Sequence, residues 1–89
     1  METKTIEKEL TAELLLDSKE LILYNDDFNT FEHVIDSLVA ICEHSPNQAE
    51  QCAYIVHYNG KCTVKKGSID KLQPMLKALQ LQRLTVKIK

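Results

Sequence analysis

A short apolar run over residues 20–24 ends at three consecutive polar residues, Asn25-Asp26-Asp27. A run of this length, bounded by a turn-forming cluster, is typical of a central β-strand. The next residues have the spacing of a helix start, in which Asn29 can cap the helix and Glu32 can reach back to the open backbone N–H groups. The chain is therefore expected to pass from a strand into a helix through one short polar loop.

Two amphipathic helices are predicted after this loop. The first should end near residues 43–44, and its apolar residues, at three- and four-residue spacing, are Phe31, Val34, Ile35, Leu38, Ile41 and Cys42. The second begins with Ser45 as the cap and Pro46 at the first helical position, and it stops at Gly60, where a left-handed cap belongs. Its apolar stripe consists of Ala49, Cys52, Ala53 and Val56.

The rest of the chain is predicted to form a strand, a helix and a final strand. Residues 62–65 read as the strand, Ser68 caps the helix, and Pro74 inside that helix should kink or restart it. Residues 84–88 alternate between apolar and polar side chains, as in a half-exposed strand. The order β-α-α-β-α-β predicts an α+β fold, a small α/β sandwich in which three helices pack on one face of a three-stranded antiparallel sheet.

Length and composition limit the class of protein. The 89 residues suffice for one domain, in which residues 20–89 form the core and the charged, weakly patterned residues 1–19 form an N-terminal extension, flexible or folded. The apolar stretches are too short to span a bilayer, and no secretory signal precedes them, so a cytoplasmic protein without membrane association is expected. The net charge of −2, without a basic block, argues against nucleic acid as a partner.

Metal, cofactor and enzyme motifs are not found in the sequence. The odd number of cysteines, Cys42, Cys52 and Cys62, indicates reduced thiols, and no C-x-x-C or H-x₃-H spacing supports a metal site. Gly60 and Gly67 are both expected at element ends, so no glycine-rich phosphate loop exists. We therefore expect a protein that is not an enzyme and uses no cofactor or metal.

Three polar side chains are candidates for a binding cluster. If the loop after the first strand meets the end of the second helix, Asn25, Asp26 and His57 form an acceptor group above the groove between two apolar helix faces. An ammonium group has only donors, so such a cluster suits the free N-terminus of a protein. Alternatively, the loop is a simple turn and His57 complements the helix dipole. His33 and His44 have no such companions and are expected to be solvated surface residues.

At these residues the chain resembles ClpS, the adaptor family that delivers proteins with destabilising N-terminal residues to a Clp unfoldase and its protease. The resemblance covers residues 20–62 without a gap and continues more weakly to the end of the chain. The matching strings are Leu23-Tyr24-Asn25-Asp26-Asp27-Phe28, Glu32-His33-Val34-Ile35-Asp36, Gln48-Ala49-Glu50-Gln51 and Val56-His57-Tyr58-Asn59-Gly60-Lys61.

The resemblance implies a role for each matching residue. Asn25 and Asp26 would bind the α-ammonium group of an N-degron, the destabilising N-terminus of a substrate, and His57 would complete its shell directly or through water. Asp27 and Asn29 would belong to the supporting loop. The pocket for the first side chain would be lined by Phe31, Val34, Ala53 and Val56 and closed by Leu84 or, less favourably, Leu81. The implied partners of this monomer are a ClpA- or ClpC-like AAA+ unfoldase and substrates with bulky hydrophobic N-terminal residues.

The sequence also departs from the family pattern. Asn29-Thr30-Phe31 stands where the family commonly has Thr-Pro-Met, which makes the pocket gate aromatic, and Ala53 stands where a larger residue such as Met is usual. On the third helix, Asp70 keeps an acid at the expected unfoldase-docking surface, but Met75 replaces an expected lysine. An alternative function is therefore a ClpS-like domain that docks on a Clp ATPase and regulates or inhibits it without recognising N-termini. Only the degron reader needs an open pocket beneath the acceptor cluster.

Overall fold

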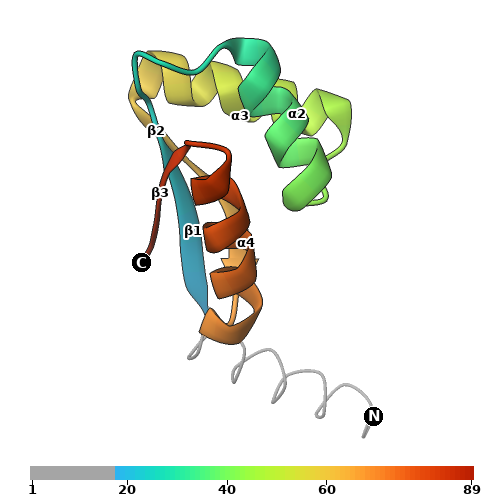
Figure 1. Cartoon of the computed structure of the whole chain (residues 1–89), viewed down its shortest axis with the longest axis vertical. Helices are drawn as coiled ribbons and strands as arrows, with labels where there is room; N and C mark the ends of the chain where they lie inside the picture. Colours follow the sequence, from blue (N-terminus) through green and yellow to red (C-terminus); the bar gives the residue numbers. More distant parts are fainter. Residues whose placement is uncertain (1–17) are drawn as a thin grey trace, which may run out of the picture.

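The computed structural model describes residues 18–89 as three strands and three helices in the predicted order (Figure 1). The elements are β1 (Lys19–Tyr24), α2 (Phe31–Ile41), α3 (Pro46–Asn59), β2 (Lys61–Gly67), α4 (Ile69–Leu81) and β3 (Thr85–Ile88). The prediction of an α+β fold with a three-stranded antiparallel sheet is confirmed. The extension predicted at residues 1–19 lies outside the described residues except for its last two, and Lys19 already belongs to β1.

The sheet has the strand order β2-β1-β3, with both neighbours antiparallel to β1. The apolar run predicted as a central strand is thus hydrogen-bonded on both sides; Leu23, for example, lies opposite Cys62 on β2 and Val86 on β3. Helix α4 runs beside β1 and β3, whereas α2 and α3 pack against each other at one end of the sheet (Figure 1). Among residues 18–89, no helix has the length and apolar content needed to cross a membrane.

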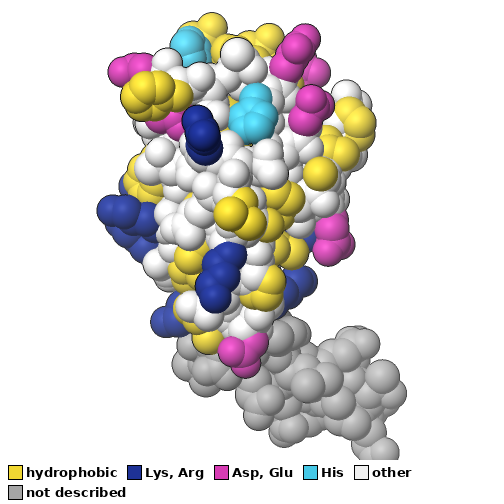
Figure 2. All heavy atoms as spheres, viewed as in Figure 1, with side chains coloured by type: hydrophobic (Ala, Val, Ile, Leu, Met, Phe, Trp, Pro, Cys, Tyr) yellow, Lys and Arg dark blue, Asp and Glu magenta, His cyan; other side chains and the backbone are white. Residues whose placement is uncertain are grey.

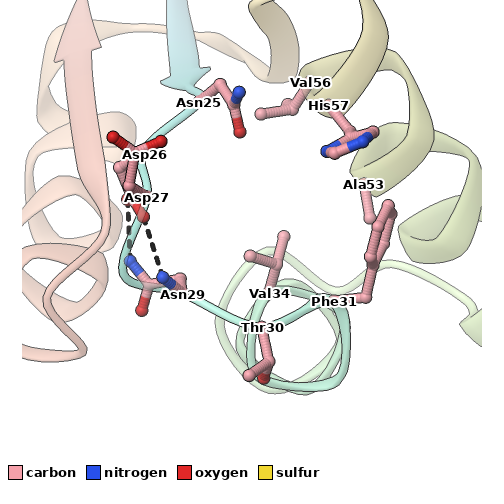
Figure 3. Close-up of a pocket in the computed structure, with 10 residues that line it drawn as sticks. All are labelled: Asn25, Asp26, Asp27, Asn29, Thr30, Phe31, Val34, Ala53, Val56 and His57. Carbon is pink, nitrogen blue, oxygen red and sulfur yellow. Dashed lines mark hydrogen bonds between the residues drawn. The ribbon is translucent and has the colours of Figure 1, made fainter.

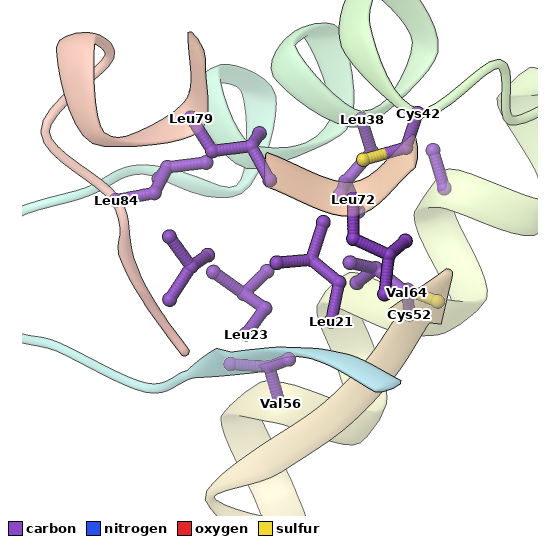
Figure 4. Close-up of a cluster of buried hydrophobic side chains, with 12 residues drawn as sticks. Leu21, Leu23, Leu38, Cys42, Cys52, Val56, Val64, Leu72, Leu79 and Leu84 are labelled. Atoms are coloured by element: carbon purple, nitrogen blue, oxygen red, sulfur yellow. The ribbon is translucent and has the colours of Figure 1, made fainter. Parts of the chain in front are cut away.

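The core is one cluster of apolar side chains between the sheet and the helices (Figure 4). Leucines fill most of it, and the fully buried ones are Leu21, Leu23, Leu38, Leu72 and Leu79. Cys42, which follows the last residue of α2, and Cys52, on the apolar face of α3, are buried here too, and burial raises the pKa of their thiols to about 11 and about 12. Cys62 is half-buried, with its Sγ 3.4 Å from Sγ of Cys52, and all three cysteines are free thiols.

The ends of α2 differ from the prediction. Thr30, and not Asn29, is the N-cap, because its hydroxyl accepts a hydrogen bond of 3.1 Å from the backbone N–H of His33. The helix ends at Ile41, two residues earlier than expected. The other predicted caps are confirmed: Ser45 and Ser68 cap α3 and α4, and Gly60 ends α3 in the left-handed conformation with φ of 91°.

Helix α4 runs through Pro74 without a restart, which excludes one of the two predicted outcomes. Because proline has no N–H, the carbonyl of Asp70 lacks its usual intrahelical partner. A further expectation is wrong. His44 is buried instead of solvated, and its Nε2 lies 2.6 Å from the carbonyl oxygen of Val64 on β2. No periodicity could predict this burial, because His44 lies in the loop between α2 and α3 and its partner is twenty residues away. Glu43, with φ of 60°, reverses the chain just before it.

Candidate functional site

A pocket of about 330 Å³ lies between the loop after β1 and the facing sides of α2 and α3 (Figure 3). The loop forms one side of it and α3 the other, with α2 below (Figure 3). Its lining residues are Asn25, Asp26, Asp27, Asn29, Thr30, Phe31, Val34, Ala53, Val56 and His57. The structure therefore brings together every residue predicted for the binding site except Leu84, and it adds Thr30.

The two segments that carry the polar cluster, the end of β1 and the end of α3, are joined by a backbone hydrogen bond. The N–H of Asn25 donates to the carbonyl oxygen of Gly60 at 2.8 Å. Gly60 can turn the chain at this point because it adopts a left-handed conformation, and its own N–H still donates to Val56 at 2.9 Å. The end of β1 is thereby held next to the last turn of α3, which carries His57.

The carboxylate of Asp26 organises the loop. Its Oδ1 accepts hydrogen bonds of 2.9 Å from the backbone N–H groups of Phe28 and Asn29, and its Oδ2 accepts one of 2.7 Å from the side-chain amide of Asn29. Burial acts to raise the pKa of Asp26, but these hydrogen bonds, together with the nearby ring of His33, outweigh it and hold the pKa below its usual value. Asp26 is therefore ionised at neutral pH and half-buried at the pocket wall.

Asn29 fastens this loop to the turn between α4 and β3. Besides its bond to Asp26, its amide nitrogen donates to the carbonyl oxygen of Arg83 at 2.9 Å. A second contact joins the same two segments: Nε2 of His33 lies 2.8 Å from the carbonyl oxygen of Gln82. The residue predicted as a helix cap thus works as a cross-link between the pocket loop and the turn before β3. Sequence reasoning had no signal for this, because the partner lies 54 residues away.

The base of the pocket is apolar and is backed by the core. Val34 and Val56 line both the main pocket and a cavity of about 20 Å³ beneath it. Leu84 lines only the small cavity, so it lies under the pocket base and not in the wall of the main pocket. Leu81, the alternative, is 82% exposed on the surface of α4. The other predicted functional residue, Asp70, is exposed in the first turn of α4, outside the pocket.

The pocket wall opposite the loop has a small side chain, Ala53 on α3, beside an aromatic one, Phe31 at the start of α2. Ala53 is buried and leaves space, and the ring of Phe31 lies 5.2 Å from the ring of His57, measured between centroids. Sequence reasoning missed Tyr54 and Tyr58, which extend this wall along α3; the Tyr54 centroid is 5.2 Å from that of Phe31. Their four-residue spacing directly after Ala53 and His57 is the signal that could have revealed them.

The two halves of the described chain carry opposite net charge, and this is a second feature that sequence reasoning missed. Residues 20–60 contain no lysine or arginine, and their acidic residues are Glu20, Asp26, Asp27, Glu32, Asp36, Glu43 and Glu50. Residues 61–89 contain one acidic residue, Asp70, beside Lys61, Lys65, Lys66, Lys71, Lys77, Arg83, Lys87 and Lys89. On the face in Figure 2, most acidic side chains lie toward the end formed by α2 and α3. The pocket is therefore suited to a ligand with a positive group.

Comparison with known proteins finds a matching family model and similar solved structures. The family model for the ATP-dependent Clp protease adaptor protein ClpS matches residues 17–87. A search of curated proteins finds no match. The solved structure of Agrobacterium tumefaciens ClpS2 bound to L-phenylalaninamide is similar with a TM-score of 0.76 and 20% sequence identity, over 82% of this chain and 95% of that one. At this identity the likeness is one of fold.

Among residues 18–89, no group of three or more histidine, cysteine or carboxylate side chains could hold a metal ion.

Proposed function

This chain belongs to the ClpS family of Clp protease adaptors, and we propose that it binds the free N-terminus of substrate proteins in the pocket between α2 and α3 and delivers them to a Clp-type AAA+ unfoldase. The observation that carries the proposal is the pocket itself, which combines an apolar base with hydrogen-bond acceptors at its rim. An adaptor that only docks on an ATPase has no need of such a pocket, so the observation favours the degron reader over a docking regulator.

The proposed ligand of the rim is the α-ammonium group. A carboxylate has about four lone-pair sites, and Asp26 uses two on Oδ1 and one on Oδ2, so that Oδ2 can accept one more hydrogen bond. The Oδ1 of Asn25 and the ring of His57 provide the other acceptors, the latter directly or through a water molecule. An ammonium group has three donors, so three acceptors saturate it. The turn interpretation of Asp26 and its binding role are thus compatible.

The proposed ligand of the pocket base is a bulky apolar first side chain. Burial of a Phe or Leu side chain contributes about 1.5–3 kcal/mol, and Val34, Ala53 and Val56 offer the apolar surface for it. A. tumefaciens ClpS2, which shares the fold, was solved with L-phenylalaninamide, a ligand that has a free α-amino group and an aromatic side chain. Both chemical features match the two parts of this pocket.

The proposed partner is a ClpA- or ClpC-like unfoldase that meets the chain at α4. Asp70 is exposed there, whereas Met75, at the position where the family pattern predicts a lysine, packs partly buried against the core. Docking on α4 would leave the pocket open, because Asp70 and the pocket residues lie on different elements. We propose that the adaptor acts as a monomer in the cytoplasm and performs no chemistry on its substrate.

The test is a titration with a short peptide that begins with a free Phe, beside the same peptide with an acetylated N-terminus. Loss of a charge-assisted hydrogen bond removes about 1.5–3 kcal/mol, so acetylation should weaken binding by about one to two orders of magnitude. Asn25→Ala should weaken the free peptide, while the exposed Asn47→Ala on the first turn of α3 serves as the matched control. Equal affinities of the free and acetylated peptides would exclude the proposal and favour the docking regulator.

A further inference from the structure

Four aromatic rings form a closed circuit at the rim of the pocket. The centroids of Phe31 and His57 are 5.2 Å apart, and both residues line the pocket. Tyr54 lies 5.2 Å from Phe31, Tyr58 lies 4.9 Å from His57, and the two tyrosines are 6.3 Å apart. The tyrosines are not among the pocket-lining residues, so the circuit continues the pocket wall outward onto the surface of α3.

The two tyrosines present their rings to solvent. Tyr54 is 49% exposed and Tyr58 is 76% exposed, and their ring planes are parallel to within 8°. They are one helical turn apart, so they lie on one stripe of α3 beside the stripe that faces the pocket. We call this pair of rings the tyrosine ledge. It is an aromatic surface continuous with the rim of the pocket.

The surroundings of the ledge favour a cation. Glu50 lies one turn before Tyr54 on the same stripe, and the carboxylates of Asp26 and Asp27 line the pocket next to it. Residues 20–60 contain no lysine or arginine. Tyr24, the last residue of β1, shows that this chain pairs cations with an aromatic face: Nζ of Lys87 and Nζ of Lys89 lie 5.8 Å and 6.0 Å from its ring centroid. Within residues 18–89, no such cation lies over either ring of the ledge.

We propose that the tyrosine ledge is a subsite for the second side chain of the bound N-terminal peptide and that it prefers arginine. The inference rests on the proposed function, which positions the α-ammonium group at the rim beside His57. One extended residue spans about 3.3–3.6 Å, and its side chain points away from the preceding one. A second side chain therefore leaves the pocket when the first enters it, and a long arginine stem reaches the ledge, where the guanidinium group stacks on the ring faces.

The test compares two peptides of equal composition and charge that both begin with a free Phe. One carries arginine at position two and alanine at position four, and the other has these two residues exchanged. A cation–π contact at an exposed site corresponds to a preference of about two- to fivefold for arginine at position two. Because the two peptides have the same net charge, the general attraction of the acidic pocket segments contributes equally to both affinities and cancels in their ratio. Glutamate at position two should bind more weakly than alanine.

Variants of the ledge decide whether the rings carry the preference. The double variant Tyr54→Leu/Tyr58→Leu keeps apolar bulk at two exposed positions but removes the ring faces, and it should abolish the preference. The matched double variant Tyr54→Phe/Tyr58→Phe keeps the ring faces and should retain it. If both peptides need a free amino group but bind equally well, or if the preference survives in the leucine variant, the subsite is refuted while the proposed function stands. If acetylation has no effect on either peptide, the proposed function itself fails.

Discussion

The end of the domain that carries the pocket and the end formed by the sheet and α4 are built by different means. At the sheet end, fully buried leucines such as Leu23 and Leu72 fill the space between the layers. At the pocket end, α2 and α3 leave an opening of about 330 Å³, and the loop beside it depends on hydrogen bonds of Asp26 and Asn29. Residues 20–60, which include those that line the pocket, contain no lysine or arginine, whereas residues 61–89 are mainly basic.

The comparison teaches that stability and recognition are separated in this small domain. A filled core tolerates no opening, because dispersion and burial both require close packing. A binding pocket requires an opening, which a few polar side chains must then hold in shape. Substitutions at the sheet end should therefore act on unfolding, and substitutions at the pocket end should act on binding.

The largest expected effect is at the sheet end. Leu72→Ala removes a fully buried side chain of α4 from the core and should lower the free energy of unfolding by about 2–5 kcal/mol, measured by urea denaturation. Leu81→Ala, on the same helix but 82% exposed, is the matched control and should stay within about 0.5 kcal/mol of the parent. Similar losses in both variants would mean that α4 does not pack as described.

The next effect is at the pocket loop. Asp26→Ala removes the carboxylate that organises the loop and, under the proposal, binds the ammonium group, so affinity for a free Phe peptide should fall about 10- to 100-fold. The loop loses three hydrogen bonds, so a smaller loss of thermal stability should accompany it. Asp27→Ala removes the same charge from the exposed neighbour and should weaken binding less. Lower stability with unchanged affinity in the folded fraction would leave Asp26 a turn residue only.

A smaller effect concerns the shape of the pocket wall. Ala53→Met should fill space that bulky or β-branched first side chains would use, and each methylene displaced corresponds to about 0.8 kcal/mol, or about fourfold in affinity. Peptides that begin with Trp, Tyr or Ile should therefore weaken more than those that begin with Leu. Gln51→Met, an exposed position on the same helix, controls for the added methionine. A uniform change across all four peptides would show that Ala53 does not contact the ligand.

The smallest effect is the dependence of stability on pH through Asp26. Because its pKa in the folded state lies below its usual value, the ionised carboxylate stabilises the fold above the unfolded-state pKa, about 3.9. This contribution is lost as the pH falls through the lower, folded-state pKa. The difference in unfolding free energy between the parent and Asp26→Asn should therefore be constant from about pH 7 to pH 5 and shrink below about pH 4. A difference that grows on acidification would contradict the direction of the pKa shift.

The sequence by itself determined the elements, their order and most of their ends. Periodic apolar spacing, Ser45, Ser68 and Gly60 act within a few residues of one another, and such local physics is visible in a chain that has not yet folded. The predicted pocket residues, carried over from the family resemblance, also line one pocket in the structure, apart from Leu84. The tyrosine spacing and the separation of charge were readable as well, and only the interpretation missed them.

Only the tertiary structure decided the long-range contacts. The burial of His44 depends on a carbonyl of β2, the role of Asn29 on a carbonyl beside β3, and the position of Leu84 on the small cavity under the pocket. Each partner lies on a different element, and no spacing along the chain encodes which backbone groups meet across a fold. A sequence pattern predicts which face of an element is buried, whereas the packing of the elements determines what that face contacts.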